Sequence, residues 1–183
     1  MKLSFISGKD INFREVNEAD AAFILALRLD DRLGRFMSQT DNDLEKQIEW
    51  IRNYKKRAQE FYFIIESKDN VPYGTIRIYD VKDDSFSWGS WIIKQGSPSY
   101  VAIQSVLLIY ETGFFKLGYS KCHFEVMKEN SKIVDFHKRF GAEVVSEDQL
   151  KFYFNLSLDD YKQLKSRYAK FMPEPVKGAV EYE

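Results

Sequence analysis

Three titratable side chains in the second half of the chain have the types and spacing needed for proton transfer, and an asparagine shares a face with one of them. His123 and Glu125 are two residues apart in KCHFEVM, which has the pattern of a strand, so both are expected on one face. Asn130 and His137 are seven residues apart in ENSKIVDFHKRFGA, which has the pattern of a helix, so they lie on nearly the same face. Carboxylate and imidazole groups exchange protons near neutral pH, which is the chemistry of general acid–base catalysis.

Each of these residues also has a structural alternative, which the sequence leaves open. Glu125 and His123 can take part in surface ion pairs. Asn130 can cap the helix that follows it, a role compatible with contact to a ligand. His137 can pack within an apolar stripe, whose other members are Ile133, Phe136 and Phe140.

The loop QGSPS at 95–99 precedes a strongly apolar helix and predicts an anion site. Ser97 is a suitable N-cap and Pro98 fits the first helical position, so the helix is expected to begin there. The next free N–H groups would point out of the helix end, where they can bind phosphate. They belong to Ser99, Tyr100, Val101 and Ala102. A capped helix end with water on its amides is the alternative.

This loop and the four polar residues belong to one continuous unit of the fold. A strand is expected at 86–94, a helix at 100–115, a strand at 121–127 and a helix at 129–142. A strand–helix–strand–helix unit of this length produces two neighbouring parallel strands.

The remaining segments extend this unit into a larger sheet. The stretches 61–66 and 72–81 precede 86–94 through tight turns, which predicts an antiparallel meander. Before the meander, one strand or two are expected at 2–6 and 12–16, and helices at 18–29 and 42–58. After the strand–helix–strand–helix unit, strands are expected at 142–145 and 151–156 and a helix at 159–170. Pro173 and Pro175 end this helix, and the last eight residues are expected to be frayed. The predicted class is α/β (α+β), a mixed sheet of six to seven strands covered by helices.

Composition limits the classes of function. The chain has 183 residues, 44% of them hydrophobic and 16% aromatic, which suits one packed domain. With 27 basic against 28 acidic side chains, no overall field favours nucleic acid or an anionic membrane. The single cysteine and two histidines give no zinc spacing, so no metal is expected. Without a signal peptide or a membrane-spanning run, we expect a cytoplasmic protein.

The order of elements over 11–157 resembles the GNAT superfamily of N-acyltransferases. The segment 130–142 is similar to the family pattern Asn-x-x-(apolar)-x-x-x-Tyr-x-x-x-Gly-Phe, with His137 in place of the tyrosine and Ala142 closing. Gln95 matches the first position of the family's phosphate loop, but the later small residues of that loop are replaced. The resemblance implies an acetyltransferase domain at 1–158, with a C-terminal helix and tail at 159–183.

The resemblance implies that acetyl-CoA enters where the strand 86–94 parts from its parallel neighbour 121–127. Its pyrophosphate would lie on the loop and helix end at 95–102, and a backbone N–H near the end of the first strand would hold the thioester carbonyl. The cofactor-binding residues so implied are Trp91, Ile92, Ile93, Gln95, Gly96, Ser97, Ser99, Tyr100, Val101, Ala102 and Asn130. His137 would replace the tyrosine that protonates the departing thiolate, and Glu125 or His123 would act as the base.

The acceptor of the acetyl group is expected to be a small amine that reacts in a ternary complex. Glu66, Arg77 and Tyr79 on the meander are candidate substrate contacts, and Trp88, like Trp91, can either stack on a sugar or base or belong to the core. Among family branches, the chain looks most like acetyltransferases of nucleotide-linked amino sugars in surface-glycan or flagellar-glycan synthesis. A ribosomal-protein N-terminal acetyltransferase and a non-catalytic acyl-CoA-binding module are the alternatives, and a homodimer is one option for assembly.

Overall fold

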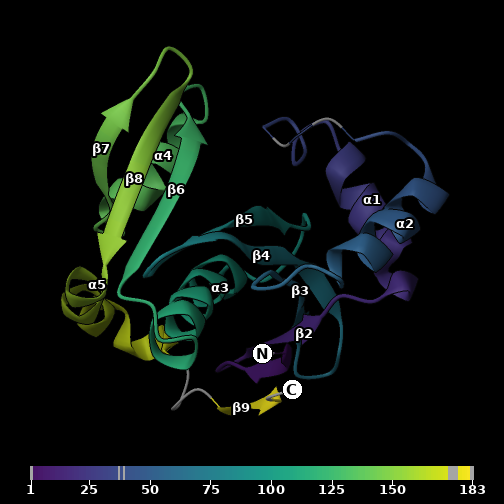
Figure 1. Ribbon diagram of the computed structural model, residues 1–183, viewed down its shortest axis with the longest axis horizontal. Coiled ribbons are helices and arrows are strands. Elements are labelled where there is room, and N and C mark those ends of the chain that lie inside the picture. Colours follow the sequence, from purple (N-terminus) through teal and green to yellow (C-terminus); the bar gives the residue numbers. More distant parts are fainter. Residues whose placement is uncertain (1, 37, 39, 173–176, 182–183) are drawn as a thin grey trace.

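The computed structural model describes residues 2–36, 38, 40–172 and 177–181, built around one mixed sheet. Its strand order is β7-β8-β6-β5-β4-β3-β2-β1-β9 (Figure 1). The strands are β1 (Lys2–Ser7), β2 (Ile11–Glu15), β3 (Phe61–Ser67), β4 (Pro72–Lys82), β5 (Ser85–Ile93), β6 (Lys121–Met127), β7 (Glu143–Glu147), β8 (Lys151–Ser157) and β9 (Lys177–Glu181). The α-helices are α1 (Ala21–Leu29), α2 (Leu44–Tyr54), α3 (Tyr100–Glu111), α4 (Ser131–Arg139) and α5 (Leu158–Lys165).

The predicted mixed sheet is confirmed, but it has nine strands rather than six to seven. The N-terminal stretch forms two strands that pair with each other, and β9 pairs with β1. The expectation that the last eight residues are frayed is therefore wrong for Lys177–Glu181. Pro173 and Pro175 lie outside the described residues. Within the described range no helix combines the length and apolar character needed to cross a bilayer.

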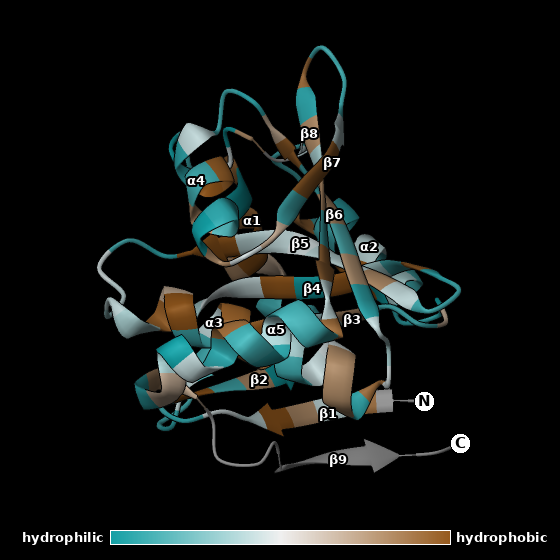
Figure 2. Cartoon of the chain, turned by 90° about the vertical axis from the view of Figure 1, so that its left-hand side faces the viewer, coloured by the Kyte–Doolittle hydropathy of each residue, from teal (hydrophilic) through white to brown (hydrophobic). Residues whose placement is uncertain are grey.

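Two apolar clusters lie on opposite faces of the sheet, and β3 contributes to both. Phe61, Phe63 and Ile65 belong to the larger cluster, which includes α3, whereas Tyr62 and Ile64 pack with α1 and α2. Because β3 is covered on both faces, all its residues are buried and its sequence FYFIIES is nearly continuously apolar. Figure 2 shows α3 and α5 lying together over the sheet face that carries the larger cluster.

The strands β6, β7 and β8, together with α4, form a projecting unit that we call the arm (Figure 1). β8 pairs antiparallel with both β6 and β7, and α4 packs on one face of these strands. The packing is aromatic: the Phe124 ring stacks on Phe154 at 5.3 Å between centroids and lies 4.3 Å from the imidazole of His137. The opposite face of the arm, with His123 and Glu125, is left uncovered by α4.

Local signals fixed the start of the first helical segment. The Asn17 side chain accepts a hydrogen bond from the Ala19 amide at 2.9 Å, and the Asp20 carboxylate accepts one from the Asn17 amide at 2.8 Å. This reciprocal capping agrees with the predicted boundary. The second helix, expected over 42–58, is shorter, because Asp43 caps its start and a turn follows Tyr54.

Candidate active site

β5 and β6 are paired over a very short length. Their parallel register joins Ser85 to Lys121 and Phe86 to Cys122, and in the described part of the chain the pairing ends there. β5 continues to Ile93 along β4, while β6 continues to Met127 as part of the arm, and the two diverge (Figure 1). From Ser87 onward one edge of β5 is therefore left without a strand partner, and its backbone groups can bind an extended ligand.

A β-bulge lies in the unpaired part of β5. Thr75 pairs with Ile92 and Arg77 pairs with Gly89, so one residue of β4 faces two of β5 between these pairs. Ser90, in the bulge, has a φ of 48°, and its carbonyl accepts a 2.8 Å hydrogen bond from the Thr75 hydroxyl. A bulge re-aims the backbone N–H groups of a strand. The Gly89-Ser90 step inside an apolar strand was the available sequence signal, and it was not recognised.

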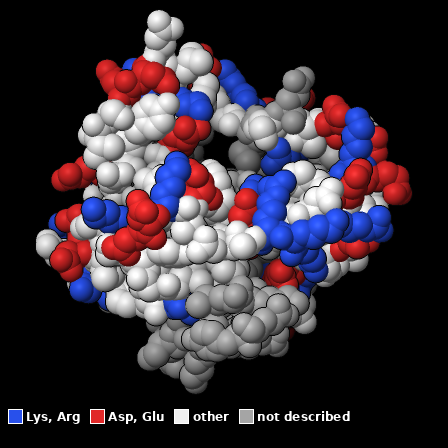
Figure 3. Space-filling view, viewed as in Figure 1, with Lys and Arg blue, Asp and Glu red and all other residues white. Residues whose placement is uncertain are grey.

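A cavity of about 620 Å³ opens where the two strands part. Figure 3 shows the surface hollowed between the arm and the side that carries α1 and α2. The cavity is lined by Asp31, Arg32, Leu33, Arg35, Phe36, Trp91, Ile92, Ile93, Ala102, Glu129, Asn130, Ser131, Lys132 and Ile133. It therefore brings together the end of β5, the first turn of α3 and the start of α4, as the sequence predicts, and adds the loop between α1 and α2.

The start of α3 differs in detail from the prediction. The helix begins at Tyr100 rather than Pro98, and Ser99 occupies the N-cap position without a side-chain cap. The Val101 amide donates to the Pro98 carbonyl at 3.0 Å, so one of the four predicted anion donors is already used. Ser97 does not cap the helix, and its hydroxyl is enclosed without a hydrogen-bond partner among the described residues. Ser97 and the other residues of 95–101 are not among those that line the cavity, so the phosphate contact of this loop stays a prediction.

Asn130 lies at the entrance to α4, where both of its predicted roles can be compared. It occupies the N-cap position, but its side chain makes no capping hydrogen bond. The same residue lines the cavity. Its amide side chain is therefore free to contact a ligand, and the contact to acyl-CoA stays a prediction.

His137 is buried beneath the cavity, one turn along α4 from Ile133. Its side chain packs against Trp88, Phe124 and Phe154, and only 4% of its surface is exposed. Burial lowers its pKa to about 3, because the charged imidazolium is poorly solvated there. The ring is thus neutral at physiological pH and has no extra proton to give, which favours the packing role.

The two base candidates lie outside this cavity. Glu125 forms an ion pair with Lys151 of the neighbouring strand. The His123 ring has Ser85 Oγ 2.6 Å from Nδ1 and Asp80 Oδ2 3.4 Å from Nε2, so both nitrogens have partners. His123 is the first β6 residue beyond the last parallel pair, and it links the arm to β4 and β5.

A second cavity, of about 280 Å³, lies under α2 on the other side of the bulge. Arg28, at the end of α1, donates to the Thr40 and Ser38 oxygens, and no described carboxylate forms an ion pair with it. The cavity is lined by Arg28, Ser38, Thr40, Asp41, Asp43, Lys46, Gln47, Trp50, Tyr62, Arg77 and Ser90. Ser90 lines this cavity and Trp91 lines the first, so consecutive residues of the β5 bulge contribute to the two cavities.

The four predicted substrate residues, Arg77, Tyr79, Trp88 and Glu66, lie in different parts of the structure. Arg77 lines the second cavity, with its guanidinium 5.2 Å from the Trp50 ring centroid. Tyr79 lies beside it on the same face of β4. Trp88 is only 4% exposed and belongs to the core, as its alternative predicted.

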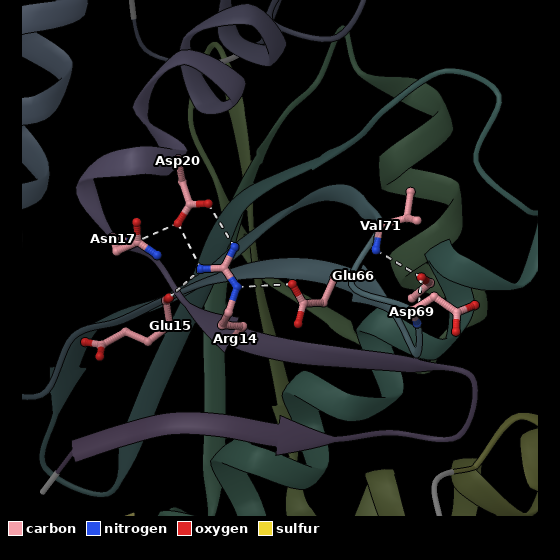
Figure 4. A network of polar contacts seen from close by, with 8 residues as sticks. Arg14, Glu15, Asn17, Asp20, Glu66, Asp69 and Val71 are labelled. Carbon is pink, nitrogen blue, oxygen red and sulfur yellow. Dashed lines mark hydrogen bonds and ion pairs between the residues drawn. The ribbon is translucent and has the colours of Figure 1, made fainter.

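Glu66 is not brought into the site. It is 2% exposed on β3, and its carboxylate accepts a 3.1 Å hydrogen bond from Arg14 Nε. Arg14 is also bound by the Asp20 carboxylate, at 2.8 Å, so the guanidinium lies between two acids (Figure 4). This arrangement fixes β2, β3 and the first helical turn to one another, which is a structural role.

Sequence reasoning missed the contribution of the segment between α1 and α2. It gave no role to Arg32, Arg35 or Phe36, all of which line the first cavity. Arg28 and Trp50, which line the second, were also overlooked. The only available signal was a cluster of arginines and an aromatic residue without a helical or strand period.

A mixed sheet whose single parallel pair splits over a cavity, beside a helix N-terminus, defines an acyl-CoA N-acyltransferase. Residues 10–143 match the family model described as an acetyltransferase (GNAT) domain, and the chain belongs to this family of enzymes. Family membership implies acetyl-CoA as the cosubstrate.

Individual relatives share the fold at several levels of similarity. The chain is 43% identical to FdhC, described as a nucleotide-linked sugar GNAT, with a TM-score of 0.83 over 91% of this chain and 97% of that one. It is 24% identical to the acetyltransferase PseH of Campylobacter jejuni over 85% of this chain and 97% of the relative. A GCN5-related N-acetyltransferase of Brucella melitensis has a TM-score of 0.78 at 15% identity, over 93% and 86% of the two chains, which shows the shared fold.

Proposed function

We propose that this enzyme transfers the acetyl group of acetyl-CoA to the primary amine of a nucleotide-linked amino sugar. The observation that carries the proposal is that consecutive residues of the β5 bulge line two cavities, Ser90 the smaller one and Trp91 the larger one. A direct transfer needs a donor and an acceptor to reach one point from two directions.

The larger cavity suits the donor. Pantetheine carries amide groups that can pair with the free edge of β5, as an added strand would. The start of α3 offers the first amides of the helix to a pyrophosphate. Arg32, Arg35 and Lys132 line the same cavity together with Asp31 and Glu129, so basic side chains outnumber acidic ones there by three to two. The residues present therefore fit acetyl-CoA.

The smaller cavity suits the nucleotide part of the acceptor. Trp50 gives a flat ring on which a base or sugar can stack. Arg28 has hydrogen bonds only to neutral oxygens among the described residues, so its charge is available to a phosphate group. An acceptor held in this way would direct its amine toward the bulge. FdhC, which is described as acting on nucleotide-linked sugars, supports this choice.

The chemistry places three demands on the site. The amine must be free of its proton, the thioester carbonyl must be polarised, and the departing thiolate must be protonated. An N–H of Trp91, Ile92 or Ile93 at the bulge serves the carbonyl. Glu125, on the face of the arm that α4 does not cover, can accept the amine proton directly or through water, although an amine must compete with Lys151 for it. The departing thiolate takes up the proton that the nitrogen loses as the amide forms, relayed through water.

The test measures thiol release from acetyl-CoA with a panel of amines. The panel holds uridine- and thymidine-diphosphate amino sugars, the free amino sugars, polyamines and peptides with a free N-terminus. We expect the nucleotide-linked amino sugars to give the highest kcat/KM. Acetylation of peptides without any of the sugar nucleotides would overturn the proposal in favour of the N-terminal acetyltransferase. Binding of acetyl-CoA by calorimetry with no thiol release on any amine would favour a non-catalytic acyl-CoA-binding module.

A further inference from the structure

The side chain of Tyr79 leans along β4 toward the bulge and lies over Gly89 of β5. A Cβ atom on residue 89 would be 2.9 Å from the Tyr79 hydroxyl oxygen and 3.2 Å from Cε1 of its ring. The tyrosine can take this position only because residue 89 has no side chain. Gly89 pairs with Arg77 and is the last β5 residue in regular register before the bulge.

A stack of side chains holds the Tyr79 ring in place. The Arg77 guanidinium lies 4.9 Å from the Tyr79 ring centroid and 5.2 Å from the centroid of Trp50, so it is placed between two aromatic rings. Arg77 Nη2 is in turn fixed by Glu60 Oε2 at 2.5 Å. Trp50 and Arg77 line the smaller cavity, which we assign to the acceptor. Trp50, Arg77 and Tyr79 therefore form a continuous stack from the smaller cavity to Gly89, the residue beside the bulge.

The position of the hydroxyl has a chemical consequence. It lies over Gly89, beside the bulge whose residues Ser90 and Trp91 line the two cavities, and on the same face of β4 as Arg77. Burial raises the pKa of Tyr79, so the hydroxyl stays protonated through the neutral range and can donate a hydrogen bond. Neutral His137 and the paired Glu125 do not offer such a donor at this position.

We propose that the Tyr79 hydroxyl donates a hydrogen bond to an oxygen of the acceptor beside its reacting amine, which leaves the lone pair of the nitrogen free to attack, and that Gly89 is a specificity-determining position because any side chain there displaces this hydroxyl. Arg77 is the positioning residue of the pair. The inference rests on the proposed function only in requiring an amine acceptor at the bulge, whatever the class of that amine.

The test is a double-mutant cycle with Tyr79→Phe and Gly89→Ala. The acceptor is whichever amine of the panel the unmodified enzyme acetylates fastest. Tyr79→Phe keeps the ring and removes the hydroxyl, and we expect kcat/KM for the acceptor to fall at least tenfold, with the KM for acetyl-CoA within twofold. Gly89→Ala should give a similar loss. The kcat/KM of the double variant should be no lower than that of the less active single variant, because both changes remove the same hydrogen bond.

Tyr153→Phe is the matched control. Its hydroxyl donates to Asp148 on the outer part of the arm at 2.8 Å, so its loss should leave acceptor kinetics within twofold. A Tyr79→Phe variant within twofold of the unmodified enzyme, or losses that add in the double variant, would overturn the inference. If Gly89→Ala does not fold, as thermal unfolding would show, Tyr79→Phe alone decides. If a peptide is the best acceptor, the amino-sugar proposal is wrong, but the role of Tyr79 can still be tested with that peptide.

Discussion

Phe86 and Cys122 form the last pair between β5 and β6, and beyond it the two strands diverge, with the end of β5 and the start of α4 lining the larger cavity. Both side chains are fully buried, with 0% exposure, so the branch point is anchored in the core. His123, the next residue of β6, is bound to Ser85 of β5 at 2.6 Å. The separation of the strands thus begins at a fixed place, and the free edge of β5 is a built feature of the fold.

Ala102→Glu should weaken the donor site selectively. Ala102 lines the larger cavity from the first turn of α3, where a carboxylate would repel the pyrophosphate and fill part of the space. We expect the KM for acetyl-CoA to rise at least tenfold, measured by thiol release at saturating acceptor. The control is Ala19→Glu, an exposed alanine in the first helical turn, which should leave this KM unchanged. Equal effects of the two changes would contradict the assignment of the donor cavity.

Arg28→Gln should weaken the acceptor site and spare the donor site. The change removes the positive charge that the smaller cavity offers to a phosphate, while glutamine can retain a hydrogen bond to Thr40. We expect the KM for a nucleotide-linked amino sugar to rise about tenfold, in line with the 1.5–3 kcal/mol of a charged hydrogen bond. The free amino sugar should respond less, because it lacks the phosphates. Arg52→Gln, an exposed arginine paired with Glu18, is the control, and a matching loss there would exclude a specific phosphate contact.

Features that depend on local sequence were predictable, and features that depend on distant packing were not. The Asn17 cap and the apolar run of α3 lie at or within the helices that they define, so these helices were recognised. The pairing of β9 with β1 joins the two ends of the chain and has no local signal. The bulge at Ser90 likewise results from the register between β4 and β5.

The same distinction applies to the site. The strand–loop–helix segment 86–102 and the start of α4 were predicted because they form one continuous unit. The loop with Arg32 and Phe36 was missed because it reaches the cavity only through the packing of α1 and α2. His137 occupies the position expected from the family pattern. Its burial between α4 and the arm strands, which decides its charge, could not be read from that pattern.

Glu66→Gln should reduce stability without changing kinetics. The change removes the charge that pairs with Arg14 in a nearly inaccessible position, so we expect the free energy of unfolding to fall by about 1–2 kcal/mol. Denaturant unfolding measures this loss. KM values for acetyl-CoA and for the acceptor should stay within twofold, because the residue lies in neither cavity. A tenfold rise in the acceptor KM with unchanged stability would restore Glu66 to the substrate site.

The burial of neutral His137 predicts a pH dependence of stability with a defined sign. Its pKa is about 3 in the folded protein against 6.5 for the ordinary side chain, so below pH 6.5 the unfolded chain binds a proton that the folded protein does not. Stability from this residue is therefore complete above about pH 6.5 and is lost as the pH falls toward 3. The limiting slope for one proton is about 1.4 kcal/mol per pH unit.

His137→Leu tests this linkage, because leucine is apolar, does not titrate and suits the surrounding aromatic cluster. We expect the free energy of unfolding of the unmodified enzyme to fall more steeply than that of the variant between pH 6 and pH 4, by about 1 kcal/mol per pH unit. Carboxylates contribute equally to both proteins and cancel in the difference. His123→Gln, which removes the other histidine and leaves His137 in place, is the matched control and should keep the slope that His137 contributes. If His137→Leu and the unmodified enzyme have parallel profiles, the imidazole is not buried in its neutral form, and a role as proton donor to the thiolate regains support.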